Sequence, residues 1–166
     1  MKKLNVVLVT ISDSRTVETD KSGKVLRELI EKSGHKVLEK LIVPDDIYQI
    51  RSIVSKYISQ NNIDVVITSG GTGITGRDGT PEAIKPLLDK EIDGFGELFR
   101  SLSFKKIKTS SLQSRALAGV ANSTFVFVLP GSTDACKTAW KNIMEHQLNS
   151  NTKPCNLVML IPRLKE

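Results

Sequence analysis

The chain has 166 residues, the length of one ordinary domain with a sizeable core, so 1–166 is predicted to form a single domain. Its net charge is +6, but the basic residues are scattered and the aromatic residues are few, which disfavours a surface that binds nucleic acid. Cys136 and Cys155 lie too far apart for a zinc or CxxC pattern and are interpreted as reduced thiols. No apolar run approaches the roughly 20 residues that cross a bilayer, so we expect a soluble, cytoplasmic protein without membrane contacts.

Apolar runs of strand and helix period alternate along the chain, which predicts an α/β fold with helices packed on a mostly parallel sheet. The segment 110–120 is interpreted as a short helix or an irregular stretch. The predicted strands cover 4–11, 36–43, 63–69 and 123–129. The first two predicted helices cover 20–32, capped by Asp20 or Ser22, and 46 to about 60, capped by Asp46. Two more cover a stretch from Thr80 that Pro86 interrupts and residues 95–104. A last helix is capped by Ser132 or Thr133, and its inward face includes Trp140.

Three predicted strands end in small or polar residues where the chain turns toward a helix. The turns are "TISDSR" after the first strand, "SGGTG" after the third and "LPGST" after the fourth. In open α/β sheets ligands bind beyond the carboxyl ends of the strands, and glycine allows backbone amides to approach an anion. The sequence therefore predicts an anion site at this edge, although each turn alone is also explained by loop geometry.

The glycine loop "SGGTGITGRDGTPEA" (69–83) contains Arg77 and Asp78. It lacks the lysine and hydroxyl of a Walker A loop, and it is not a dinucleotide fingerprint. A carboxylate among phosphate-binding amides favours a bound Mg²⁺, which would separate Asp78 from a phosphate. Two structural alternatives remain: Asp78 pairs with Arg77, or it caps the helix that begins near Thr80.

Asp45 follows the second predicted strand and would reach the same edge of the sheet, because its neighbour Asp46 is explained as a helix cap. His35 and His146 are assigned to solvent or loop positions, since neither has a nucleophile nearby. Cys136 is predicted to be buried on the packing side of the last helix.

Four segments in this order, "TSGGTGITGRDGTPEAI", "GFGELFRSLSF", "LQSRALAGVAN" and "LPGSTDACKTAW", resemble the MoaB/MogA molybdopterin-binding family over almost the whole chain. The resemblance implies a three-layer α/β/α, Rossmann-like fold. It also implies a homo-oligomer, either a trimer or a hexamer built from two trimers, and contacts with other cofactor-biosynthesis proteins.

The same resemblance implies molybdenum cofactor biosynthesis, in which AMP passes from Mg-ATP to the terminal phosphate of molybdopterin and pyrophosphate is released. Asp45 and Asp78 match the two functional aspartates, as catalytic residues and as ligands of Mg²⁺. An alternative is a pterin-binding or carrier protein without catalysis, and a third is a basic nucleic-acid-binding module. The residues expected to face the substrates, ATP and molybdopterin, are Ser12, Asp13, Gly70, Gly71, Thr72, Gly73, Ser114, Arg115, Gly131 and Ser132.

Overall fold

A computed structural model describes residues 1–164 and contains one six-stranded sheet in the order β2-β1-β3-β6-β5-β4. The first four strands of that order are parallel, whereas β5 is antiparallel to β6 and β4 is antiparallel to β5. The parallel part is therefore the predicted α/β sheet. The strands are β1 (Asn5–Ile11), β2 (Lys36–Val43), β3 (Val65–Ser69), β4 (Lys90–Glu91), β5 (Leu117–Ala121) and β6 (Thr124–Leu129).

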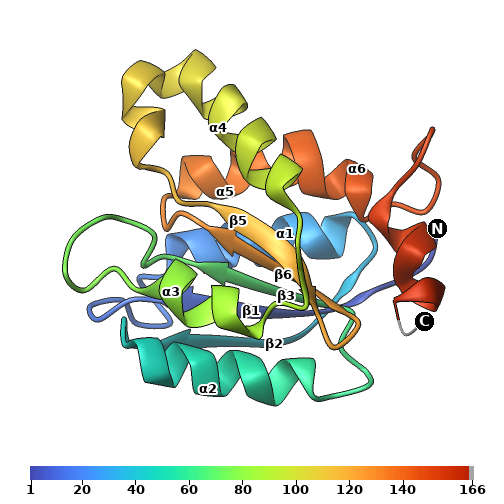
Figure 1. The fold of residues 1–166 in the computed structure, drawn as a ribbon, viewed down its shortest axis with the longest axis horizontal. Coiled ribbons are helices and arrows are strands. Elements are labelled where there is room, and N and C mark those ends of the chain that lie inside the picture. Colours follow the sequence, from blue (N-terminus) through green and yellow to red (C-terminus); the bar gives the residue numbers. More distant parts are fainter. Residues whose placement is uncertain (165–166) are drawn as a thin grey trace.

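Helices cover both faces of the sheet and make three layers, as predicted (Figure 1). On one face lie α1 (Lys21–Lys32), α4 (Asp93–Ile107), and a continuous helical segment of α5 (Thr133–Ala139), the π-helical turn η3 (Trp140–Met144) and α6 (Glu145–Gln147). On the other face lie α2 (Ile47–Ile58) and α3 (Thr80–Ile84). Three 3₁₀ segments complete the fold: η1 (Lys85–Leu87), η2 (Lys108–Gln113) and η4 (Leu157–Arg163). Within residues 1–164 no helix has the length and apolar character needed to span a membrane.

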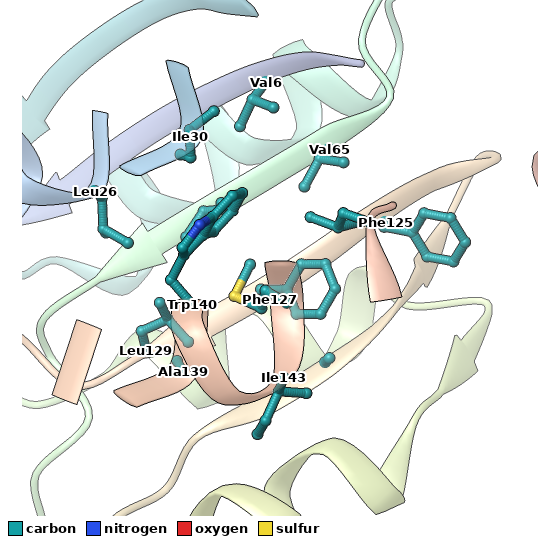
Figure 2. Close-up of a cluster of buried hydrophobic side chains, with 14 of the residues drawn as sticks. Val6, Leu26, Ile30, Val65, Phe125, Phe127, Leu129, Ala139, Trp140 and Ile143 are labelled. Carbon is teal, nitrogen blue, oxygen red and sulfur yellow. The ribbon is translucent and has the colours of Figure 1, made fainter. Parts of the chain in front are cut away.

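The central strands β1, β3 and β6 contribute alternate side chains to two separate cores, because neighbouring strand residues point to opposite faces. In β1, Val6 and Leu8 join the core under α1 and α4, while Val7 and Val9 join the core under α2. Figure 2 shows the first core, in which the Trp140 indole lies among side chains of α1 and of the strands. Trp140 is fully buried, as predicted, and so is Cys136.

Side-chain caps set the start of three α-helices. Asp46 was the predicted cap of α2, and Asp20 and Ser132 were each one of two predicted candidates. The Asp20 carboxylate accepts from the Gly23 N–H at 2.9 Å, and Asp46 accepts from the first-turn amides of α2. Ser132 Oγ accepts from the Ala135 N–H at 3.1 Å. These bonds satisfy backbone donors that a helix start otherwise leaves free.

The prediction of a short helix or an irregular stretch for 110–120 was correct for 110–113, which belongs to the 3₁₀ segment η2, and wrong for the second part of the segment, which is strand β5. It pairs with β6 through a two-residue turn at Asn122 and Ser123, whose φ angles are +45° and +67°. Two consecutive residues with positive φ make the type of tight turn that matches the twist of a hairpin. The small side chains of "ALAGVA" are enclosed by this pairing, which outweighs their weak strand propensity.

His35 lies in the loop between α1 and β2, one of the two positions predicted for it, but it is not exposed to solvent. His35 is only 4% exposed, and its Nδ1 accepts from the Leu4 N–H at 3.2 Å. Its ring meets Trp140 edge to face, with 6.3 Å between the centroids. The histidine is therefore part of the core at the end of the sheet where β1 begins. His146, in contrast, is exposed as expected.

Candidate functional site

The turns after β1, β3 and β6 meet at Gly70, at the end of the sheet away from the two chain termini (Figure 1). A Cβ on Gly70 would lie 2.2 Å from the carbonyl oxygen of Ile11, and a Cβ on Gly131 would lie 3.2 Å from the Gly70 Cα. Gly70 has a φ of +110°, and its N–H donates to Leu129 O at 3.0 Å. Only glycine combines this φ with so close an approach of three backbones.

Two carboxylates lie against the glycine loop. A Cβ on Gly71, whose φ is +63°, would lie 2.8 Å from an Asp45 oxygen, and a Cβ on Gly73 would lie 2.5 Å from Asp78 Oδ2. Thr80 fixes the start of the loop, because its Oγ1 donates to Gly70 O and its N–H donates to Gly71 O, both at 2.9 Å. The structure thus brings the two predicted aspartates to one loop.

The two carboxylates differ in their electrostatic surroundings. Burial raises the pKa of Asp45, and the negative charges of Asp78 and Asp13 raise it further, against the Gly79 N–H bond that lowers it. Hydrogen bonds from Thr75 hold the pKa of Asp78 below its ordinary value. The site therefore carries an excess of negative charge, which a cation would neutralise.

Neither structural alternative for Asp78 is correct. Arg77 pairs with Asp13, to which its Nη2 donates at 2.8 Å, and α3 begins at Thr80 with Gly79 as its N-cap and no side-chain cap. The Asp78 carboxylate instead accepts from the N–H of Thr75 at 3.1 Å and from the Thr75 hydroxyl. This local turn orients the carboxylate, but it leaves lone pairs on a group that offers about four acceptor sites.

Asp13 links the turn after β1 to two other parts of the site. Besides the pair with Arg77, it accepts from the Asp45 N–H at 3.0 Å. The Arg77 guanidinium holds the pKa of Asp13 below its usual range. Asp13 therefore helps to hold the backbone of Asp45 in position.

The Arg115 guanidinium bonds to three groups of the protein. Its Nε donates to Thr72 O at 3.2 Å, its Nη2 donates to Asp78 O at 3.1 Å, and its Nη1 pairs with Glu82. The neighbouring Ser114 Oγ is buried and has no hydrogen-bond partner within residues 1–164. The hydroxyl is therefore available to a ligand, whereas the arginine is already engaged.

The remaining predicted residues shape the turns. Ser12 Oγ accepts from the backbone N–H groups of Ser14 and Arg15 at 3.2 and 3.1 Å, and Ser132 caps α5. A cavity of about 240 Å³ opens between the glycine loop, α4 and the start of α5. Its lining includes Thr72, Gly73, Phe99, Ser114, Pro130 and Ser132.

Sequence reasoning missed Arg15, Thr75 and Lys40. Arg15 Nη2 donates to the carbonyl of Gly131 at 2.9 Å and so ties the turn after β1 to the turn after β6. Lys40 of β2 pairs at 2.6 Å with the buried Asp20 beneath that turn. The contacts of Arg15 and Lys40 join segments that are distant in the sequence, so no local spacing predicts them. Thr75, in contrast, lies only three residues before Asp78 in the same loop.

Residues 1–164 contain no group of three or more His, Cys, Asp or Glu side chains arranged to hold a metal ion. The site at the glycine loop offers two carboxylates, Asp45 and Asp78. Two carboxylates suffice for Mg²⁺, which is commonly bound by one or two of them together with substrate phosphates and water.

The fold and site define an α/β protein that presents glycine turns and acidic side chains at the carboxyl edge of a parallel sheet, which suits a phosphorylated ligand. Residues 7–150 match the family model described as a probable molybdopterin binding domain, and the chain belongs to this family.

The chain is similar to molybdenum cofactor biosynthesis protein B of Escherichia coli strain K12, with 51% identity over 151 residues, or 91% of this chain and 89% of the relative. A crystal structure of molybdenum cofactor biosynthesis protein B aligns with a TM-score of 0.86 and 47% identity, covering 89% of this chain and 92% of that one. The tungsten cofactor synthesizing protein MoaB from Pyrococcus furiosus aligns with a TM-score of 0.80 and 34% identity, covering 100% and 99%.

Proposed function

We propose that the protein acts in molybdenum cofactor biosynthesis, where it binds molybdopterin and adenylylates it with Mg-ATP, releasing pyrophosphate. The observation that carries this proposal is the position of the Asp45 and Asp78 carboxylates against one glycine loop, at Gly71 and Gly73. Phosphoryl and nucleotidyl transfer need little covalent help from a protein and depend on positioning and charge neutralisation. Glycine-loop amides and two aspartates are the groups such a reaction requires.

In the proposed reaction, an oxygen of the terminal pterin phosphate attacks the α-phosphorus of ATP. A new bond forms between that oxygen and the α-phosphorus, while the bond from the α-phosphorus to the pyrophosphate oxygen breaks. The attacking phosphate is anionic at neutral pH, so no general base is needed. The loop at 70–73 would hold the phosphates in line, and the buried Ser114 hydroxyl, which has no partner within residues 1–164, can donate to a phosphate or pterin oxygen.

The two carboxylates fit the magnesium ion of Mg-ATP. Both are oxygen donors of the kind that Mg²⁺ prefers, and the pKa of Asp45 is raised in part by the other two acids of the site. When bound, the ion would neutralise the charge on the phosphates. Asp45 and Asp78 would hold it, and Asp13 would keep Asp45 in place through the Asp45 N–H.

The proposal extends to partners and location. The ligands would be a small pterin and a nucleotide, with no role for nucleic acid or a membrane. The protein would work in the cytoplasm as a homo-oligomer, a trimer or a hexamer of two trimers, in contact with other proteins of the pathway. The names of the relatives support the pathway, molybdenum cofactor biosynthesis.

A second candidate is a protein that binds molybdopterin without transferring AMP to it. The bonds from Thr75 to the Asp78 carboxylate favour this reading, because they give Asp78 a purely local function in the loop. In that case the glycine loop and the 240 Å³ cavity would hold the pterin phosphate and ring without a need for the metal.

Asp78→Asn separates the two candidates. Asparagine retains the volume and one acceptor oxygen for Thr75, so the loop and pterin binding should persist, but the charge that holds Mg²⁺ is lost. We expect a fall in adenylylated pterin of about 100-fold or more, measured with molybdopterin, ATP and Mg²⁺, since one well-placed charge contributes roughly this factor. Pterin binding by the wild type without any adenylylated product would establish the second candidate instead.

A further inference from the structure

The segment 72–78 leaves the sheet after the glycine turn and returns at the start of α3 with little packing of its own. Ile74 at its tip is 72% exposed, and Thr75, Gly76 and Arg77 are also exposed. A loop without buried apolar side chains takes its position from polar contacts. Since Asp78 lies at the end of this segment, the polar contacts of the segment determine the position of the Asp78 carboxylate.

Arg115 contacts both ends of the segment at once. Its Nε bonds to the carbonyl of Thr72 and its Nη2 to the carbonyl of Asp78, at 3.2 and 3.1 Å. The remaining nitrogen of the guanidinium, Nη1, pairs with Glu82 of α3. Arg115 is 37 residues from Asp78 in the chain and immediately precedes the hairpin β5–β6, so it ties the loop to the rigid sheet.

We infer that Arg115 is a positioning residue that closes the segment 72–78 and thereby sets the place of Asp78, and that it is not a phosphate ligand. The inference rests on the proposed function for its effect on transfer, whereas its effect on the loop stands alone. A guanidinium presents donors in a fixed, planar fork, which can bond two carbonyls and a carboxylate together. A lysine ammonium keeps the charge, but it cannot span the two ends of the loop.

The test compares Arg115→Lys with Arg100→Lys by hydrogen exchange and by pterin adenylylation. Arg100 is a matched control because it also donates to a backbone carbonyl, that of Ala116 at 3.1 Å, and lines a common cavity with Arg115 without a bond to the loop. In Arg115→Lys we expect amides of 72–79 to exchange about tenfold faster while those of β1 and β6 stay unchanged. Adenylylation should fall about tenfold and need more Mg²⁺, whereas Arg100→Lys should leave both measurements near wild type.

Unchanged exchange of 72–79 in Arg115→Lys would overturn the inference, whatever happens to activity, because the loop would then be held by other contacts. Equal acceleration in β1 and β6 would overturn it too, since the variant would have loosened the whole fold. Faster exchange of 72–79 with wild-type transfer would refute the link to Asp78. If the wild type transfers no AMP, the proposed function fails, and the exchange comparison still decides the structural role of Arg115.

Discussion

Asp20→Asn should destabilise the protein more than any change at an exposed charge, because Asp20 is the centre of a buried ionic cluster. Its carboxylate is fully buried and lies 2.6 Å from the ammonium of Lys40, which is itself 14% exposed. It also accepts from the Thr10 hydroxyl at 2.8 Å and from the Gly23 N–H at 2.9 Å. Asparagine leaves two cations beside a neutral group: the Lys40 ammonium, and the Arg15 guanidinium 3.6 Å from the carboxylate.

Removal of one partner from a buried ion pair costs about 3–5 kcal/mol, and asparagine retains part of the hydrogen bonding, so we expect ~3 kcal/mol. For a domain of this size 1 kcal/mol lowers Tm by roughly 2–4 °C, which gives a fall of about 6–12 °C. Thermal unfolding followed by circular dichroism measures it. The double variant Asp20→Asn/Lys40→Met removes the Lys40 charge but keeps that of Arg15, and should recover part of this loss.

The Asp20 cluster also predicts the response to acid. Burial by itself raises the pKa of Asp20, but the bonds from Lys40, Gly23 and Thr10 outweigh it and the pKa is lowered. Its contribution to stability is therefore complete above the unfolded pKa and lost as the pH falls through the folded pKa. Two results would refute the reasoning about the Asp20 cluster: a Tm of Asp20→Asn within about 1 °C of wild type, or a Tm of the double variant no higher than that of Asp20→Asn.

Two further predictions concern the glycine loop and the buried histidine. Gly71→Ala should lower the free energy of unfolding by ~2 kcal/mol and abolish AMP transfer to the pterin. The φ of Gly71 is positive, and the new Cβ would lie 2.3 Å from Thr80 Oγ1. Gly76→Ala, which meets no atom within 4 Å, should match wild type in the same denaturation and transfer assays. Burial lowers the pKa of His35 against the charge of Asp64, so the unfolded chain binds an extra proton below about pH 6.5. Urea unfolding at several pH values should show that the free energy of unfolding falls toward acid by up to ~1.4 kcal/mol per pH unit. This dependence on pH should be weaker in His35→Asn, and the same dependence in wild type and variant would contradict the prediction.

The parallel part of the fold could be predicted because its strands are continuous apolar runs that end in turn residues. Strand β5 could not be recognised in the same way, since Leu117–Ala121 contains small residues and becomes a strand only by pairing with β6. The Asn122–Ser123 turn was a usable signal for that hairpin and was overlooked. Strand β4 has two residues, too few for any period to appear.

For the site, the sequence predicted which turns converge but not how their side chains pair. Asp45 and Asp78 could be placed at one edge because both follow parallel strands. The pairing of Arg77 with Asp13, 64 residues away, instead of with the adjacent Asp78 depends on the relative position of two loops. The burial of His35 likewise arises from the packing of Trp140 against it. Contacts of this kind are decided by tertiary structure, on which single-sequence patterns carry no information.

The close approach of three backbones at Gly70 has a mechanical consequence. No side chain separates Ile11, Gly70 and Gly131, and so no flexible group can absorb a displacement of one turn. A displacement of Gly70 by a ligand would therefore also move the turns that follow β1 and β6.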